Sequence, residues 1–373
     1  MSITRRQWLA QGAGIVTGIG LTGCGVLDQV RALPPTDPIV APQNFGSGPV
    51  LIGGKRVRTI DVHGHCYVAE ALAMLGSEAQ SVLPPVKGVP EHFIVVPERL
   101  RTMDAMRVDM EILSINPFWY RREREITTRI VRLQNEKMSE LCALAPQRLG
   151  AFASLPLQFP ELAVKELEHA MTKLGLRGAA IGSNLNGTDF SDAQFFPVWE
   201  AAEAMGATLF IHPISAPELA KRYKGNGWLS NTIGNPLDTT IALQHLIFQG
   251  ALDRFPGLKV LAAHGGGFLP SYAMRGDHAC FVSPTSCNPD IVLKKKPSEY
   301  VSQLYFDAMV FSGEGLRHLV AQVGASQLML GTDHPIPWEL ALVDHVMGTP
   351  ISDAEKAAIL GENAAKLLGI QGA

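Results

Sequence analysis

Imidazole and carboxylate side chains recur at the ends of short apolar runs in this sequence. His63 and His65 close one run, and alternate residues of a strand point to the same face, so both side chains project together. The other members of the set end three later runs: His212, His264 and Asp333. A single His-x-His pair is more often ordinary packing than a ligand pair. The repetition at several strand ends indicates a site for Zn²⁺ or a similar first-row divalent ion.

The elements that must position these side chains alternate between strand and helix. Eight short apolar runs are predicted as strands: Val57–His65, Met110–Asn116, Leu149–Pro156, Arg177–Asn184, Ala207–Pro213, Lys259–Gly265, Leu304–Val310 and Gln327–Pro335. Helical patterns separate them: 97–107, 124–145, 160–174, 194–205, 236–254, 267–278, 313–323 and 352–368. This α/β order predicts a (β/α)8 TIM barrel, whose strands open on one mouth. A doubly wound open sheet is the alternative, but no Gly-rich phosphate motif follows the first strand.

The composition excludes several classes of protein. The 373 residues include 32 Lys and Arg against 35 Asp and Glu, so the net charge is −3, which is unlike a basic nucleic-acid-binding protein. With 46% hydrophobic and 18% charged residues, the chain is not typical of a disordered protein. Five cysteines are too few for a disulfide-stapled miniprotein, and no apolar run is long enough for a polytopic membrane protein.

The N-terminal residues have the pattern of an export signal rather than of a domain. Arg5 and Arg6 precede a weakly apolar, Gly-rich stretch, as in bacterial twin-arginine signals. The stretch ends at Leu21–Cys24, which resembles a lipoprotein cleavage box in which Cys24 would be acylated. We expect a signal at 1–24, a tether at 25–56 and the barrel at 57–373, in an exported periplasmic or membrane-anchored protein. The alternative is a cytosolic protein with a chance Arg-Arg pair.

Five motifs together resemble the aminocarboxymuconate-semialdehyde decarboxylase branch of the amidohydrolase superfamily. They are Asp61-Val62-His63-Gly64-His65, Leu209-Phe210-Ile211-His212-Pro213, Ala263-His264-Gly265-Gly266-Gly267, Tyr305-Phe306-Asp307-Ala308-Met309-Val310 and Gly331-Thr332-Asp333-His334-Pro335. The resemblance implies a metal-dependent barrel with one zinc or manganese ion. It implies His63, His65, His212 and Asp333 as ligands, with His264 as the acid/base and Asp333 as a second catalytic group. No lysine ends the Arg177–Asn184 run, which favours a mononuclear site.

These motifs leave the reaction open. The same site serves a non-oxidative decarboxylase of an aromatic or enol-type acid, a hydrolase of a lactone or amide, or a hydratase, and a surface lipoprotein that only binds metal is a further alternative. Arg275 matches a family arginine that binds substrate and can reach a neighbouring subunit, which implies a homodimer; otherwise it is a surface arginine. The family's decarboxylase also has an arginine after the first strand. Residues 66–97 contain none, only Lys87 and His92 as cationic candidates, so the aminocarboxymuconate substrate itself is in doubt.

Several further residues have a local interpretation. Asp307 is a candidate to orient a ligand histidine, or else a structural acceptor; His334 and Cys66 alternate away from the ligands and are expected to be structural. Cys280 and Cys287 are close enough in sequence to pair in an oxidising compartment, but the sequence does not decide this. Aromatic candidates for the pocket, each otherwise ordinary packing, are Phe93, Trp119, Tyr120, Trp228 and Trp338.

Overall fold

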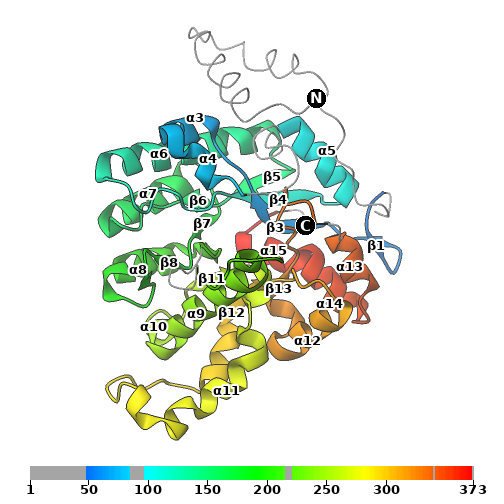
Figure 1. The fold of residues 1–373 in the computed structure, drawn as a ribbon. Helices are drawn as coiled ribbons and strands as arrows, with labels where there is room; N and C mark the ends of the chain where they lie inside the picture. The colour runs from blue at the N-terminus through cyan, green and yellow to red at the C-terminus, as the bar shows by residue number, and fades with distance from the viewer. Residues whose placement is uncertain (1–47, 85–95, 215–220, 339–340, 372–373) are drawn as a thin grey trace. The chain divides into compact units, whose positions relative to one another are not determined.

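The eight apolar runs form parallel strands in the computed structural model, which describes residues 48–84, 96–214, 221–338 and 341–371 (Figure 1). The barrel strands are β3 (Ile60–His65), β4 (Met110–Ser114), β5 (Leu149–Ala151) continued by β6 (Ala153–Ser154), β7 (Gly178–Ile181), β10 (Thr208–Ile211), β11 (Lys259–Ala262), β12 (Leu304–Asp307) and β13 (Leu328–Met329). All lateral pairings among them are parallel. The predicted (β/α)8 barrel is therefore confirmed.

Hydrogen bonds close the strands into a ring. One sheet has the order β13-β12-β11-β10-β7-β6, and the other has the order β3-β4-β5. The two sheets join where β5 runs into β6, because the amide of Phe152 donates to the carbonyl of Leu113 at 2.9 Å. They join again between the first and last strands, where a parallel bridge pairs Gly64 with His334. The closure places the ends of β3 and β13, and hence the first and last motifs, side by side.

Helices surround the strands (Figure 1). The α-helices are α3 (Ala69–Ala73), α4 (Ala79–Val82), α5 (Val96–Met106), α6 (Arg124–Leu144), α7 (Pro160–Thr172), α8 (Phe196–Met205), α9 (Asn235–Phe248), α10 (Ala251–Arg254), α11 (Leu269–Val282), α12 (Gly313–Val323), α13 (Leu342–Gly348), α14 (Asp353–Ala357) and α15 (Asn363–Leu368). Short 3-10 or π segments are η1 (Gly76–Glu78), η3 (Ala193–Phe195), η5 (Ser230–Gly234), η6 (His264–Gly266), η7 (Pro284–Ser286), η8 (Pro297–Gln303), η9 (Ala325–Gln327) and η10 (Ala358–Glu362). The sequence did not predict α3, α4 or α13, which are short and interrupt loops.

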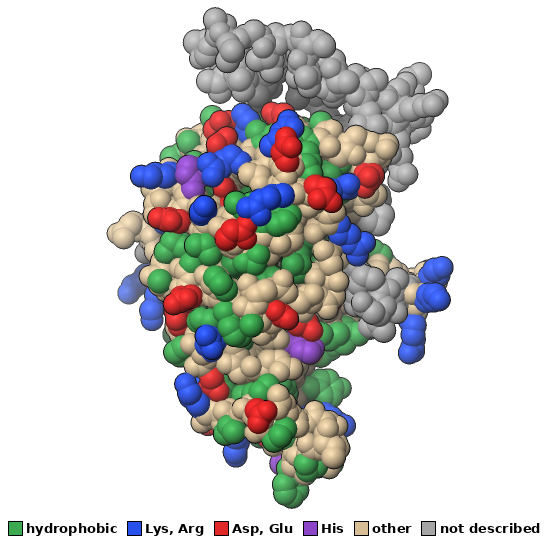
Figure 2. Space-filling model, turned by 90° about the vertical axis from the view of Figure 1, so that its left-hand side faces the viewer, with side chains coloured by type: hydrophobic (Ala, Val, Ile, Leu, Met, Phe, Trp, Pro, Cys, Tyr) green, Lys and Arg blue, Asp and Glu red, His purple; other side chains and the backbone are tan. Residues whose placement is uncertain are grey.

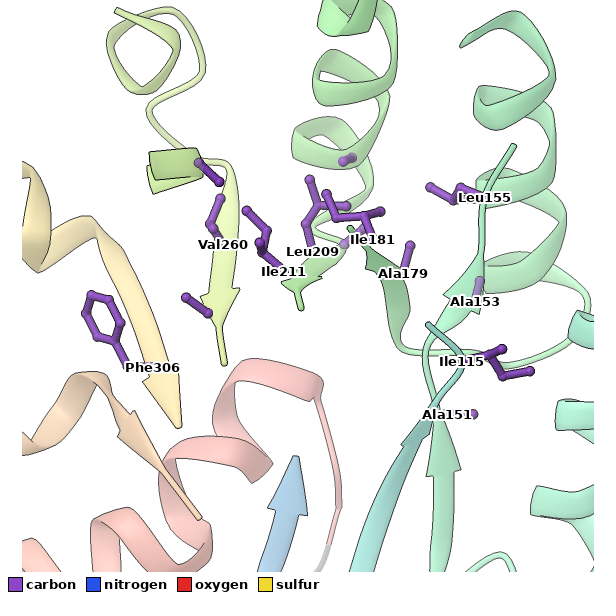
Figure 3. Close-up of a cluster of buried hydrophobic side chains, with 14 of the residues drawn as sticks. Ile115, Ala151, Ala153, Leu155, Ala179, Ile181, Leu209, Ile211, Val260 and Phe306 are labelled. Atoms are coloured by element: carbon purple, nitrogen blue, oxygen red, sulfur yellow. The ribbon is translucent and has the colours of Figure 1, made fainter. Parts of the chain in front are cut away.

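Alternation along each strand divides the apolar side chains between two cores. Ala179 and Ile181 of β7 pack outward against the helices with Leu209 and Ile211 of β10 (Figure 3). Phe210 of β10 instead joins the interior cluster of the barrel. The interior cluster also contains Ile60, Val62, Met110, Ile112, Phe152, Ala180, Leu261, Ala263 and Met329, together with Ala364, Ala365, Leu367 and Leu368 of α15. The barrel is thus a packed core on which polar strand ends are mounted.

Two short hairpins lie outside the barrel sheet. β1 (Leu51–Ile52) pairs with β2 (Lys55–Arg56) in antiparallel fashion, and Val50 just before them is buried. Residues 50–56 therefore belong to the folded unit, which corrects the predicted end of the tether at residue 56. β8 (Asn184–Leu185) and β9 (Thr188–Asp189) form the second hairpin, directly after β7.

The predicted export signal and lipid attachment point, including Arg5, Arg6 and Cys24, lie outside the described residues. Within the described ranges, no helix combines the length and apolar character that crossing a membrane requires. The surface that Figure 2 shows carries Lys and Arg side chains interspersed with Asp and Glu. This mixture agrees with the net charge of −3.

A disulfide joins Cys280, in the last turn of α11, to Cys287, which directly follows η7. The structure thus pairs the two cysteines whose pairing the sequence left undecided. Cys66 is a buried thiol, as expected, and its sulfur faces Met138 rather than the barrel mouth. Burial raises the pKa of Cys66 to about 12, so this thiol stays protonated and inert.

Candidate metal centre and active-site cavity

Four buried side chains converge at the mouth of the barrel. Each of His63, His65, His212 and Asp333 offers one ligand atom, and these atoms all lie within 4.8 Å of one another. They come from the ends of β3 and β10 and from the segment that follows β13. The ligand set that the sequence predicted is therefore brought together in space.

An irregularity in β3 aims both of its histidines into the barrel. Ile60 and Val62 point to the interior core, so strict alternation would turn His63 away from it. The pairing of β3 with β4 shifts register between Asp61 and Gly64, as in a β-bulge. The His63 ring consequently lies 5.2 Å from that of His212, and the His65 ring lies 4.7 Å from it.

A buried charge cluster beneath Gly64 supports this turn of the chain. A Cβ atom at position 64 would come within 2.7 Å of Cγ of Glu111, so only glycine fits there. Glu111 is held by Arg99 at 2.8 Å and by Nδ1 of His334 at 2.8 Å. Arg99 also donates to the backbone carbonyl of His65. His334 is therefore structural, as predicted, and the cluster fixes the backbone that carries the ligand.

Hydrogen bonds on the outer ring nitrogens fix the tautomers of two ligands. Nδ1 of His63 donates to Oδ2 of Asp307 at 2.7 Å, and Nδ1 of His212 donates to the carbonyl of Pro213 at 2.9 Å. Their Nε2 atoms are then lone-pair donors that face the cluster. Asp307 thus has the orienting role that was one of its two predicted roles.

The remaining contacts of the cluster fit a cation. Nε2 of His63 lies 3.3 Å from Nε2 of His65 and 3.3 Å from Oδ1 of Asp333. Burial, reinforced by the neighbouring His65, lowers the pKa of His212 well below its usual range and keeps this imidazole neutral. Neutral imidazoles and a carboxylate are the forms that bind a metal. Burial would lower the pKa of His63, but its hydrogen bonds to Asp307 and Asp333 raise it to about 10, so an incoming metal ion must displace a proton from this ring. Three imidazoles and one carboxylate suit a single first-row divalent ion.

Asp333 is held at both its backbone and its side chain. It has a positive φ of 60°, which is rare for a residue other than glycine. Such a strained backbone persists only where surrounding contacts hold it, and it is common at functional sites. Asp61 accepts hydrogen bonds from the amides of His63 at 2.9 Å and Thr332 at 3.0 Å, so it holds together the two segments that carry the candidate ligands His63 and Asp333. The indole Nε1 of Trp338 donates to Oδ2 of Asp333 at 3.0 Å. This leaves Oδ1 as the atom that faces the histidines.

His264 lies against the ligand histidines, at the start of η6. Its ring is 5.1 Å from that of His63 and 5.3 Å from that of His212. Its backbone amide donates to Oδ2 of Asp307 at 2.9 Å, and its Nδ1 is buried without a hydrogen-bond partner among the described residues. Burial and the neighbouring His63 lower the pKa of His264 to about 4. The imidazole is therefore neutral, and its unpaired Nδ1 is free to form a hydrogen bond with a bound molecule.

A cavity of about 810 Å³ opens onto this cluster. Of the ligands, His65, His212 and Asp333 line it. Its wall also contains the apolar and polar side chains Tyr67, Val82, Leu83, Phe118, Tyr120, Ile214, Trp228, Ile336, Asn116, Asn184, Asn186, Asn231 and Asn235. Tyr120 and Trp228 thus line the pocket, as one interpretation of the sequence had it. Trp119 is instead fully buried, with Nε1 donating to the carbonyl of Leu155 at 2.8 Å, and Phe93 lies outside the described residues.

The structure and the sequence disagree about the cationic side chain of the pocket. Arg275 is exposed on α11 and does not line the cavity of its own chain. Arg121 and Arg122, which follow β4, do line it. They follow Trp119 and Tyr120 in a loop from which the sequence predicted only these two aromatic side chains as candidates for the pocket. Lys87 and His92 lie outside the described residues.

The fold and the site together define a barrel enzyme with a single divalent-metal centre at its mouth. The Amidohydrolase family model matches residues 60–370, and the chain belongs to this family. It is 33% identical over 278 residues to 2-amino-3-carboxymuconate-6-semialdehyde decarboxylase from Dictyostelium discoideum, a match that covers 73% of this chain and 76% of that relative. The resemblance inferred from the motifs is thereby confirmed.

Solved structures with the same fold include further decarboxylases. 5-Carboxyvanillate decarboxylase from Sphingomonas paucimobilis matches with a TM-score of 0.78 and 28% identity, over 84% of this chain and all of that chain. Dihydroxybenzoic acid decarboxylase from Polaromonas sp. JS666, solved with manganese and the inhibitor 2-nitroresorcinol, matches with a TM-score of 0.73 and 26% identity, over 85% and 98% of the two chains. These relatives are carboxy-lyases, which favours that class over the hydrolase alternative.

Proposed function

We propose that this protein is a metal-dependent, non-oxidative decarboxylase of an aromatic carboxylic acid that carries a phenolic hydroxyl. The observation that carries the proposal is the joint geometry of the ligand cluster and His264. His264 packs against the ligand histidines, and three of the four ligands line a cavity. The two relatives of solved structure named above are decarboxylases of acids of this kind. Such a reaction needs no oxidant, because the carbon–carbon bond to the carboxylate breaks, CO2 leaves and a proton takes its place.

The residues of the chain divide the work of this reaction. When bound, the divalent ion supplies positive charge that binds and polarises oxygen atoms of the substrate. His63, His65, His212 and Asp333 would hold it, with Asp307 and Trp338 fixing the orientation of two of these ligands. In this proposal His264 holds the proton that is exchanged at the ring carbon, a role that its unpaired Nδ1 beside the ligand histidines supports. Asp333, the second catalytic group that the family resemblance implies, would act through the ion that its Oδ1 helps to hold.

The decisive experiment measures CO2 release and hydrolysis in parallel. Metal-loaded enzyme is supplied anaerobically with hydroxybenzoates in one arm and with aryl lactones and anilides in the other. We expect CO2 from the hydroxybenzoates only, whereas hydrolysis without CO2 release would overturn the proposal. His264→Ala should abolish turnover while the metal content stays at one ion per chain; loss of the metal instead would contradict the acid/base role.

The identity of the metal is a separate proposal. Three nitrogen ligands and one oxygen suit Zn²⁺, which is our prediction from the donor set. The Polaromonas relative was solved with manganese, so Mn²⁺ is the alternative. Metal analysis of protein produced without added ions, followed by activity after exchange into each metal, distinguishes the two.

We also propose that the protein forms a homodimer through α11. Tyr272, Met274 and Phe281 of this helix are exposed, and Phe281 is 85% accessible, which is unusual for a large apolar side chain. Arg275 lies on the same helix and would then belong to the interface or reach the partner's cavity. Light scattering should give twice the chain mass for the wild type, and Phe281→Glu should halve it.

Export is proposed from the N-terminal Arg5-Arg6 pattern and the cleavage box that ends at Cys24. The Cys280–Cys287 disulfide supports it, because such bonds persist in oxidising compartments. Mass spectrometry of the mature N-terminus from a bacterial membrane fraction tests both export and lipid attachment. An unprocessed N-terminus in the cytosol would contradict the proposal.

A further inference from the structure

Two neighbouring arginines line the cavity, and they differ in their partners. Arg122 forms an ion pair with Glu78 at 2.5 Å, so an acidic side chain already offsets its charge. Arg121 has one hydrogen bond, from Nε to Oδ1 of Asn186 at 3.1 Å, and no acidic partner among the described residues. Arg121 is therefore the cation of the cavity wall whose charge is not offset within the described part of the chain.

The acceptor of that hydrogen bond is itself held in place. Asn186 sits in the tight turn between β8 and β9 with a positive φ of 52°, followed by Gly187 with a φ of 91°. Asn-Gly with both residues at positive φ is the turn that a two-residue hairpin favours. Nδ2 of Asn186 donates to the carbonyl of Tyr120 at 3.0 Å, which leaves Oδ1 facing Arg121. The hairpin thus fixes Nε, and within the described residues the two terminal nitrogens of Arg121 remain available.

The charges of the cavity are separated by depth. The ligand cluster is buried, whereas Arg121 is exposed at the rim. Asn116, Phe118 and Tyr120 of the same loop contribute neutral side chains to the wall. The volume of about 810 Å³ lies in the upper part of the range for small-molecule sites, so it has room for substituents beyond the reacting carboxylate.

From this arrangement we infer that Arg121 is a specificity-determining residue that binds a second anionic group of the substrate, away from the carboxylate that is lost. The terminal nitrogens of an arginine match a carboxylate in a bidentate geometry. The inference rests on the proposed decarboxylase function and narrows it to aromatic diacids. In this assignment the first carboxylate reaches the inner end of the cavity while Arg121 holds the second at the rim.

The test compares two substrates that differ by one carboxylate: 2-hydroxybenzoate and 4-hydroxyisophthalate. Arg121→Met should raise KM for the diacid about 10- to 100-fold, the usual worth of a charged hydrogen-bonded pair, with kcat within about twofold. KM for the monoacid should not change. Arg124→Met is the matched control, because Arg124 is three positions further on, pairs with Glu161 at the surface and does not line the cavity.

A second variant tests the positioning. Asn186→Gly keeps a residue that tolerates positive φ but removes the acceptor for Nε, so it should raise KM for the diacid less than Arg121→Met does. Equal effects of Arg121→Met on both substrates, or no effect on either, would overturn the inference.

The outcome stays separable from that of the proposed function. If wild-type enzyme releases CO2 from neither acid, calorimetry measures binding of 4-hydroxyisophthalate to metal-loaded wild type and to Arg121→Met. Tight binding to the wild type that weakens 10-fold or more in the variant would support the anion-binding site, even though the proposed decarboxylation would be contradicted. No binding, or equal binding to both proteins, would show that Arg121 does not form an anion-binding site.

Discussion

The indole Nε1 of Trp338 donates a hydrogen bond to Oδ2 of Asp333 at 3.0 Å, and this leaves Oδ1 alone to face the histidine cluster. The indole is held in turn by aromatic neighbours. Its ring lies 5.0 Å from that of Phe311 and 6.2 Å from that of Trp228, stacked on the latter. An aromatic layer at the mouth therefore orients the single carboxylate of the metal site.

Trp338→Phe keeps an aromatic ring in this layer and removes only the indole N–H. We expect metal affinity to fall about 10- to 100-fold, as for other groups that orient metal ligands. Competition with a fluorescent chelator measures it. Trp228→Phe is the control, since it alters the same stack without touching Asp333. Equal affinities of Trp338→Phe and wild type would show that the hydrogen bond does not position the carboxylate.

Asp307 connects the metal site to the proposed acid/base. Oδ2 accepts from Nδ1 of His63 at 2.7 Å and from the amide of His264 at 2.9 Å, while Oδ1 accepts from the amide of Gly265 at 2.8 Å. Asp307→Asn must place an amide NH2 against at least one of these donors, whichever way it is flipped. We expect weaker metal binding and a loss of kcat of at least about 100-fold. Competition with a chelator measures the metal affinity, and CO2 release measures kcat. Unchanged kcat at saturating metal would restrict Asp307 to metal binding.

The sequence predicted the barrel because apolar strand patterns alternate with helical patterns, and it predicted the site because four of the strands end in a polar group that an apolar core does not require. His63, His65, His212 and Asp333 were all identifiable from strand-end position and from the family resemblance. What the sequence could not predict depends on contacts between distant segments. Arg121 has an unremarkable local sequence, and its place in the cavity wall and its hydrogen bond to Asn186 become visible only in the folded chain.

The same reason explains the other residues that sequence reasoning missed. Arg99 and Glu111 lie on a helix and a strand with ordinary patterns, but barrel closure buries them together under His65. Arg275, chosen from the family resemblance, is exposed on α11 and outside the cavity of its own chain. Local pattern identifies groups at strand ends, whereas loop contributions become visible only once the loops are placed.

Gly64→Ala should destabilise the protein. The new Cβ would lie within 2.7 Å of Cγ of Glu111, and Glu111 cannot swing away because Arg99 and His334 hold its carboxylate. Overpacking of this kind typically costs about 1–3 kcal/mol in the free energy of unfolding, measured by urea titration. Gly348→Ala is the control, because a Cβ there has no atom within 4 Å. Equal stability of the two variants would mean that β3 can shift to accommodate the new Cβ without a loss of unfolding free energy.

Acid pH should reduce the stability that the Arg99–Glu111–His334 cluster contributes, and the variant Glu111→Gln measures this contribution. Burial alone would raise the pKa of Glu111, but the Arg99 guanidinium and the His334 ring lower it to about 2 from an ordinary value of 4.5. A carboxyl with a depressed folded-state pKa stabilises the protein above the unfolded-state pKa and loses that contribution as pH falls toward the folded value. The stabilisation, on the order of 3 kcal/mol, is therefore complete above about pH 5 and disappears toward pH 2.

The neutral amide of Glu111→Gln mimics the protonated acid at every pH. The variant should thus be less stable than wild type at pH 7, and the difference in unfolding free energy should shrink steadily between about pH 4.5 and pH 2. Urea titrations at several pH values measure this difference, in which the titration of carboxylates that do not interact with Glu111 cancels. The exception is Asp61, whose pKa Glu111 raises. A difference that stays constant across this window would mean that Arg99 and His334 do not hold Glu111 in its charged form.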